Sequence, residues 1–148
     1  MAADPPRWVP PLTLLLALLG ALISGYLTIE HYTSAVVLAC PETGVVNCAK
    51  VTSSPQSVLL GIPVALLGLL YFVGLLPLML PAAWRRDGLT WVRLVAVGTG
   101  LPMVAYLIHA ESVLRAICLY CTAVHVISVA LLCSVIIAVA LREASADV

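Results

Sequence analysis

Charge is what this sequence of 148 residues lacks most: Asp, Glu, Lys and Arg make up 9% of it, against about 25% in an average soluble domain. Acidic and basic side chains are equal in number, seven of each, so no basic excess exists with which to bind a nucleic acid. Disorder is also excluded, because disordered segments are polar and charged, whereas 63% of these residues are hydrophobic. The composition indicates a small integral membrane protein with a single domain, residues 1–148.

Four long apolar stretches dominate the chain. A helix needs roughly 20 apolar residues to cross the hydrocarbon core of a bilayer, and such segments lie at about residues 9–29, 58–80, 89–109 and 117–141. A short polar tail, 143–148, follows the last of them. The expected fold is an all-α membrane protein, a bundle of four transmembrane helices. A cleaved signal peptide is the alternative for the first segment, although its apolar region is longer than the usual 7–15 residues.

Positively charged side chains predict how the chain crosses the membrane, since cytoplasmic connections are enriched in Lys and Arg. With both termini in the cytoplasm, the outer side carries only Lys50 and Arg115. The inner side then carries Arg7, Arg85, Arg86, Arg93 and Arg142. We therefore expect a multi-pass protein of the cell (inner) membrane, with the connections 30–57 and 110–116 on the outer, periplasmic face.

Four of the five cysteines fall on this outer face, where disulfides persist. Cys40 and Cys48 lie in the first outer connection. Cys118 and Cys121 form a Cys-Leu-Tyr-Cys motif where the fourth span begins, and the dipole and free amides of a helix start stabilise a thiolate. Two such pairs can pass two electrons by thiol–disulfide exchange and discharge them into a lipid-soluble acceptor. Cys133 is expected roughly 22 Å further along the helix, as a packing thiol.

Two other interpretations of these cysteines stay open. The pairs are static disulfides in a structural membrane protein with four spans, or the thiols and His125 bind a metal in a transport or metal-binding protein. Thiolates and imidazole are ligands of zinc and copper(I). The spans contain almost no acidic residues to form a metal pathway, however, and the thiols lie on the oxidising side. The redox interpretation, which needs no metal, is therefore favoured.

The cysteines and their surroundings resemble the vitamin K epoxide reductase family, in its prokaryotic, disulfide-forming branch without a fused thioredoxin domain. The resemblance begins with Cys40, a gap of seven residues, and then the run Cys-Ala-Lys-Val-Thr-Ser-Ser-Pro at 48–55. The run Gly-Ile-Pro-Val-Ala-Leu-Leu-Gly follows at 61–68, and Cys-Leu-Tyr-Cys at 118–121 completes it. Together these segments span nearly the whole chain, from about residue 10 to 141.

This resemblance implies a role for each cysteine of the two pairs. Cys40 would exchange with a separate, secreted thioredoxin-fold partner protein, Cys48 would pass electrons to Cys118, and Cys121 would reduce a membrane quinone, ubiquinone or menaquinone. The resemblance also implies a short half-helix in the outer loop. Ser54, at the end of that half-helix, would hydrogen-bond near the contact between Cys121 and the quinone.

The sequence departs from the vertebrate members of the family at two positions. Their second-span asparagine, which contacts the vitamin K carbonyl, is replaced by Val64, and their tyrosine four residues past the second motif cysteine is His125. Both changes favour plain quinone reduction, with vitamin K epoxide or vitamin K quinone reduction as the alternative. His125 shares a helical face with the cysteine motif, and a histidine inside a membrane is a candidate for function. We therefore predict that it binds quinone; the alternative is a histidine satisfied by Ser24 or Thr28.

Overall fold

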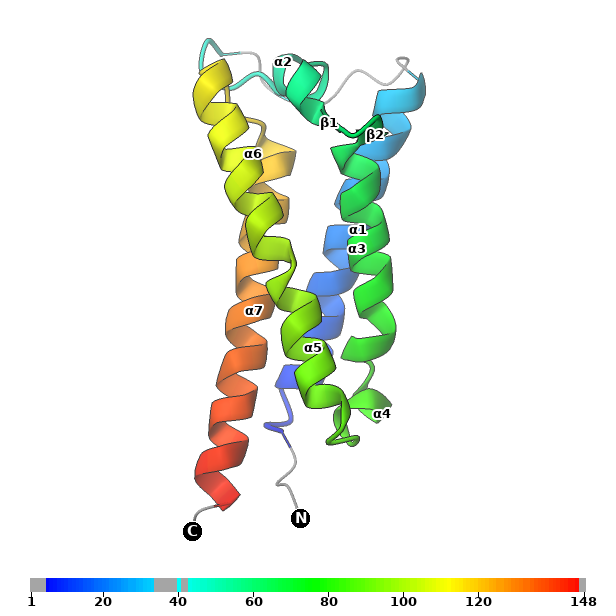
Figure 1. The fold of residues 1–148 in the computed structure, drawn as a ribbon, viewed down its shortest axis with the longest axis vertical. Coiled ribbons are helices and arrows are strands. Elements are labelled where there is room, and N and C mark those ends of the chain that lie inside the picture. The colour runs from blue at the N-terminus through cyan, green and yellow to red at the C-terminus, as the bar shows by residue number, and fades with distance from the viewer. Residues whose placement is uncertain (1–4, 34–39, 41–42, 147–148) are drawn as a thin grey trace.

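The structure, a computed structural model, describes residues 5–33, 40 and 43–146. Helices make up most of it, and the long ones run along a common direction (Figure 1). A two-stranded antiparallel hairpin is the exception to the expected all-α fold. In chain order the elements are α1 (Val9–Thr33), α2 (Cys48–Thr52), the 3-10 turn η1 (Pro55–Ser57), β1 (Val58–Leu59), β2 (Ile62–Pro63), α3 (Val64–Met79), α4 (Pro81–Trp84), α5 (Leu89–Gly98), α6 (Gly100–Leu114) and α7 (Leu119–Ala146).

Within the described residues, three helical stretches are long and apolar enough to cross a membrane: Val9–Thr33, Leu89–Leu114 and Leu119–Ser145. Helix α3 is also apolar but has only 16 residues, a length of about 24 Å. The helix of the second predicted span begins at Val64 rather than at residue 58, because residues 58–63 form the β1–β2 hairpin. The structure thus shows three candidate spans and one shorter apolar helix.

The third span is longer than predicted and is interrupted near its middle. Helices α5 and α6 are separated at Thr99, because Pro102 has no N–H to donate to the carbonyl of Gly98, four residues earlier. Helix α6 then continues to Leu114 rather than ending at residue 109. The connection to α7 is therefore only a few residues long, and residues 110–114 belong to a helix.

Small residues allow the helices to pack closely. Helix α1 lies against α3 and α7, and Gly20 approaches the Phe72 ring so closely that a Cβ there would overlap it. The ring belongs to a buried apolar core that runs between α1, α3, α5 and α7. The largest fully buried apolar side chains of this core are Phe72, Leu75, Met79, Trp84 and Leu131. This close packing fixes the positions of the long helices relative to one another.

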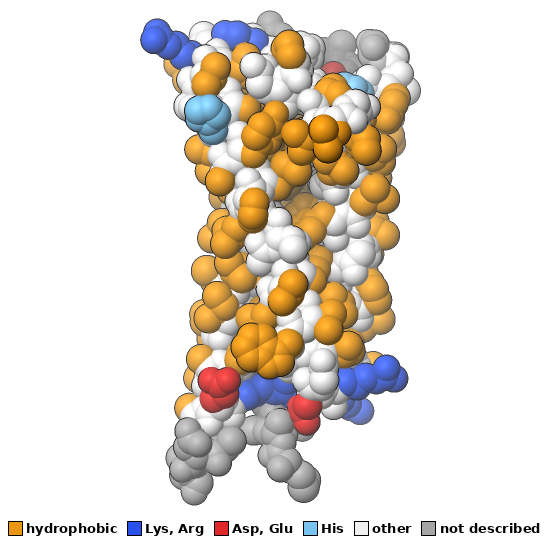
Figure 2. All heavy atoms as spheres, in the orientation of Figure 1, with side chains coloured by type: hydrophobic (Ala, Val, Ile, Leu, Met, Phe, Trp, Pro, Cys, Tyr) orange, Lys and Arg blue, Asp and Glu red, His pale blue; other side chains and the backbone are white. Residues whose placement is uncertain are grey.

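Helix α1 begins and α7 ends at one end of the bundle, and α2 lies at the other end (Figure 1). On the face shown in Figure 2, hydrophobic side chains cover the middle, and charged side chains lie toward the two ends. At the end where α1 begins, Arg93 is fully buried, lies 3.8 Å from the centre of the Trp84 ring and donates hydrogen bonds to the carbonyls of Leu78 and Ala83. These two bonds satisfy backbone carbonyls near the ends of α3 and α4.

Candidate functional site

Helix α2 is a short helix that positions Cys48. It begins there because the side chain of Asn47 accepts a hydrogen bond from the backbone N–H of Lys50, 2.8 Å away, which is the usual action of an N-cap. The ammonium group of Lys50 then reaches across to α6 and donates to the carbonyl of Leu114, at 2.8 Å. The half-helix expected in the outer loop is therefore present, and it is attached to the end of α6.

Backbone pairing also fixes the loop against the connection before α7. The N–H of Asn47 donates to the carbonyl of Ile117 at 3.1 Å, and the N–H of Ile117 donates to the carbonyl of Val45 at 2.8 Å. Asn47 and Ile117 each directly precede a cysteine, Cys48 and Cys118. These two bonds therefore hold the two cysteines next to each other.

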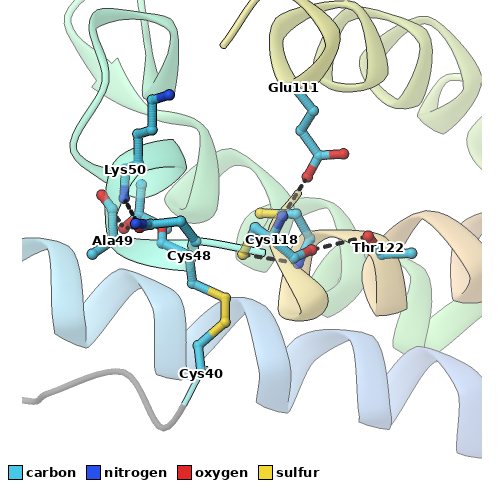
Figure 3. Close-up of a disulfide and its surroundings, with 10 residues drawn as sticks. Cys40, Cys48, Ala49, Lys50, Glu111, Cys118 and Thr122 are labelled. Carbon is cyan, nitrogen blue, oxygen red and sulfur yellow. Dashed lines mark hydrogen bonds between the residues drawn. A yellow bond between two sulfur atoms is a disulfide. The ribbon is translucent and has the colours of Figure 1, made fainter. Parts of the chain in front are cut away.

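The two cysteine pairs differ in their bonding state. Cys40 and Cys48 form a disulfide (Figure 3), whereas Cys118 and Cys121 are free thiols. Cys48 and Cys118 are both fully buried and belong to one apolar cluster, against which Cys40 and Cys121 also pack. The structure therefore brings together all four cysteines predicted to form the site.

Cys118 occupies the residue before α7, where its sulfur accepts a hydrogen bond from the backbone N–H of Cys121, at 3.4 Å. The hydrogen bond from the Cys121 side chain lowers the pKa of the Cys118 thiol below its ordinary value, against the opposing effect of burial. The backbone N–H of Cys118 donates in turn to the carboxylate of Glu111, at 3.1 Å (Figure 3). The hydrogen bond from Cys121 and the start of the helix thus favour a thiolate on Cys118, whereas the negative charge of Glu111 opposes it.

A cavity of about 180 Å³ lies beside these cysteines, and mainly apolar side chains from α1, α3, α6 and α7 line it. Three of the residues predicted from the sequence, Ser54, Cys121 and His125, line this one cavity. Ser54 is buried and donates its hydroxyl to the carbonyl of Val51, at 2.7 Å. The cavity is therefore a shared space between the second cysteine pair and the two residues expected to contact a quinone.

His125 is buried, and its Nε2 atom has no hydrogen-bond partner among the residues that the structure describes. Neither of the alternative partners, Ser24 and Thr28, forms a hydrogen bond with this atom; the hydroxyl of Thr28 donates to the carbonyl of Ser24, at 2.6 Å. A buried polar atom without a partner costs about 1–3 kcal/mol. Because this atom lies at the wall of the cavity, it is available to a molecule that enters the cavity.

The model of the vitamin K epoxide reductase family matches residues 11–136 of the chain. The chain belongs to this family. The resemblance recognised from the cysteine spacing is thereby confirmed. Membership makes the protein a membrane thiol oxidoreductase of a family that uses quinones as electron carriers.

Three residues of this family member differ from, or add to, what the sequence indicated. Cys133 is exposed on the surface of the bundle, so its prediction as a packing thiol was wrong.

Tyr71 lines the cavity and donates its hydroxyl to the carbonyl of Val97, at 3.1 Å. Glu111 also lines the cavity and was missed altogether. A signal for it existed: it is an isolated acidic residue seven positions before the first cysteine of the motif, in an apolar region.

The described part of the chain contains no group of three or more His, Cys, Asp or Glu side chains arranged to hold a metal ion. The thiols and His125 therefore do not form a ready-made metal centre there, although soft ligands of this kind suit zinc and copper(I). What the geometry offers instead is two exchangeable cysteine pairs beside an apolar cavity.

Proposed function

We propose that the protein oxidises the thiols of a secreted thioredoxin-fold partner and passes the electrons to a membrane quinone, so that it supports disulfide bond formation. This function places it in the prokaryotic, disulfide-forming branch of its family. The observation that carries the proposal is the position of Cys121, which packs against the buried cysteines Cys48 and Cys118 and also lines the cavity. A thiol in both places can connect disulfide exchange to an apolar oxidant.

The electrons enter at the loop pair. A partner thiolate attacks the sulfur of Cys40, the bond to Cys48 breaks, and Cys48 is released as a thiolate. Cys48 then attacks Cys118 in a Cys118–Cys121 disulfide, which lies in the same buried cluster, and Cys121 is released. The second thiolate of the partner then attacks the mixed disulfide, which leaves the partner oxidised and releases Cys40. Cys40 attacks Cys48 in the Cys48–Cys118 bond, which re-forms the Cys40–Cys48 disulfide and leaves Cys118 and Cys121 reduced. That is the bonding state seen in the structure.

Reduction of the quinone is then the remaining half-reaction. The two thiols of Cys118 and Cys121 lose two electrons and two protons and form one disulfide, and the quinone gains both electrons and both protons to become the quinol. This exchange of electrons and protons needs no metal or flavin. Either ubiquinone or menaquinone can accept the two electrons and two protons.

The cavity fits the ring of a quinone better than the whole molecule. Its volume of about 180 Å³ is below the roughly 300–1,000 Å³ of sites that enclose a drug-sized ligand, so the isoprenoid tail would extend into the lipid. The unpartnered Nε2 of His125 can donate a hydrogen bond to a quinone carbonyl. Val64 lines the cavity and offers no polar group where vertebrate members have asparagine, which favours a plain quinone over vitamin K epoxide.

We infer four membrane crossings within one domain, residues 1–148. Helix α1 begins and α7 ends at the same end of the bundle (Figure 1), and this requires an even number of crossings. Among the described residues, three helical stretches are long enough to cross, so α3, extended by the hairpin and by α4, supplies the fourth crossing. With the Arg-rich end in the cytoplasm, the cysteines lie on the outer face of the inner membrane.

Turnover by cysteine variants in lipid nanodiscs tests this function. A reduced thioredoxin-fold protein serves as the electron donor and a short-chain ubiquinone or menaquinone as the acceptor, and quinone absorbance gives the rate. Replacing any one of Cys40, Cys48, Cys118 or Cys121 with Ala should reduce turnover to the uncatalysed rate. Cys133→Ala is the matched control and should keep full activity. Full activity of the Cys40→Ala protein would overturn the proposed relay.

A further inference from the structure

Glu111 is a carboxylate in the last turn of α6, in the wall of the cavity that Cys121 also lines. Its Oε1 atom accepts a hydrogen bond from the backbone N–H of Cys118, at 3.1 Å (Figure 3). Its own carbonyl accepts from the N–H of Ala116, at 3.2 Å, where α6 ends. Among the described residues that line the cavity, Glu111 is the one acidic side chain. The carboxylate is thus held between the reactive cysteines and the cavity.

Capping of α7 does not by itself explain a carboxylate at this position. The sulfur of Cys118 already accepts from the N–H of Cys121 in the first turn of α7, and neutral Ser or Asn side chains cap helices as well as Asp does. Glu111 also lies within a helical stretch that can cross the membrane, where acidic side chains are rare and mark proton pathways. The charge at this position therefore indicates a chemical role.

The chemistry at the cavity requires the movement of protons. When the dithiol is oxidised, two protons leave the sulfur atoms and two are taken up by the quinone oxygens, while the walls of the cavity are mainly apolar. Resting on the function proposed above, we propose that Glu111 is the proton-transfer residue of the quinone-reducing step. Its carboxylate accepts a hydrogen bond from the backbone of Cys118, one of the two cysteines that lose a proton, and it borders the cavity in which the quinone takes protons up.

The step balances as follows. The S–S bond between Cys118 and Cys121 forms, two S–H bonds break, and the two electrons pass to the quinone. The carboxylate of Glu111 accepts one thiol proton and releases it to one quinone oxygen, and the second thiol proton goes to the other oxygen. Glu111 ends the turnover ionised, as it began.

Several ionisable groups surround Glu111 and take part in any pH dependence. On the cavity wall these groups are Cys121 and His125 on α7, His31 on α1 and Tyr71 on α3. Lys50 of α2 donates to the carbonyl of Leu114 beside them, and Arg115 follows α6 with its side chain exposed. Glu111 must be ionised to accept a proton. The quinone-reducing rate should therefore fall as the pH is lowered through the pKa of Glu111.

Two substitutions separate proton transfer from capping. Glu111→Gln keeps an oxygen that can accept from the N–H of Cys118 but cannot transfer a proton, whereas Glu111→Ala removes both functions. Ser112→Ala, an exposed change in the same helical turn, is the matched control. The first measurement is the oxidation of pre-reduced protein by a short-chain ubiquinone in rapid mixing, across pH. The second is the exchange of partner thiols with the Cys40–Cys48 disulfide in the absence of quinone.

A third measurement needs no quinone: titration of the thiolate absorbance of the reduced protein. The negative charge of Glu111 raises the pKa of the Cys118 thiol, so Glu111→Gln should lower that pKa, and thiolate should appear at lower pH than in the wild type. In rapid mixing, Glu111→Gln should slow quinone reduction about a hundredfold or more and remove its decline toward acid pH. Exchange with the partner and the Ser112→Ala protein should both match the wild type.

The opposite results are equally clear. If Glu111→Gln reduces quinone at the wild-type rate and only Glu111→Ala is slow, the side chain acts as a hydrogen-bond acceptor and the proton-transfer role is overturned. If the wild type exchanges disulfides with the partner but reduces no quinone, the proposed function itself is wrong, and the role of Glu111 that rests on it is wrong as well.

Discussion

Replacing Gly20 with Ala should disturb both the stability of the bundle and the cavity. A Cβ at this position would lie 2.6 Å from the Cζ atom of Phe72, whereas carbon atoms pack best at about 3.5–4.0 Å. Phe72 is fully buried in the core and also lines the cavity. The ring therefore cannot move outward, and the shift that relieves the overlap would push it toward the space proposed for the quinone.

The magnitude follows from two opposing effects. Overpacking a close-packed core costs about 1–3 kcal/mol, and replacing Gly by Ala inside a helix regains up to about 1 kcal/mol. With the full gain of about 1 kcal/mol, we expect a net loss of about 0–2 kcal/mol in the free energy of unfolding for Gly20→Ala, and thus a stability about 1–3 kcal/mol below that of a Gly→Ala variant without the overlap. Gly74→Ala, on α3, is the matched control because a Cβ there meets nothing within 4 Å. The difference between the two variants isolates the packing effect.

The assay is reversible unfolding in mixed micelles, followed by helical circular dichroism, with the KM for a short-chain quinone measured in parallel. Gly20→Ala should be the less stable variant and should have the higher KM. Combining it with Phe72→Leu, which opens the space around the added methyl group, should recover part of the lost stability. Equal stability of the Gly20→Ala and Gly74→Ala proteins would refute the close contact between α1 and α3.

Three further predictions concern the site itself. Asn47→Ala removes the N-cap of α2 and should cost about 1 kcal/mol and slow exchange between the cysteine pairs, while Asn47→Asp retains both; equal exchange rates for all three proteins would contradict this. His125→Phe should raise the KM for quinone about tenfold, because one buried hydrogen bond to the quinone is lost. An unchanged KM would show that His125 does not contact the quinone. Cys121→Ala removes the thiol that donates to Cys118 and should raise the pKa of Cys118, so its thiolate absorbance should appear at higher pH than in the wild type; a titration at lower pH would contradict the assigned hydrogen bond.

The helical character of the chain was predictable from apolar runs, but some helix ends were not. Residues 58–63 are mostly apolar, and hydropathy does not distinguish a hairpin from a helix there. The turn between the strands, Leu60 and Gly61, has φ values of 52° and 82°, a conformation disfavoured in Leu and common in Gly. At the other boundary, α6 continues past the apolar run to Leu114, since a helix is not obliged to stop where its side chains become polar.

The cysteine site was predictable because spacing and sidedness both appear in the sequence. The contacts that assemble it were not, because they are made between residues distant in the chain. The pairing of Asn47 with Ile117 depends on the loop lying across the connection before α7. Glu111 was not predicted because the sequence indicates a connection at residues 110–116. In the structure α6 continues to Leu114, and this last helical turn directs the Glu111 side chain to the backbone of Cys118. The exposure of Cys133 was not predictable either, since both faces of this helix are apolar.

The central claim is that a quinone occupies the cavity beside Cys121, and its most direct test is an absorption spectrum. In the Cys118→Ala protein the Cys121 thiol has lost its disulfide partner and can remain as a thiolate next to a bound quinone. Adding ubiquinone or menaquinone should then produce a new long-wavelength band from charge transfer between the Cys121 thiolate and the quinone. The protein that carries both Cys118→Ala and Cys121→Ala should show no band. A Cys118→Ala protein that binds quinone without this band would contradict the claim.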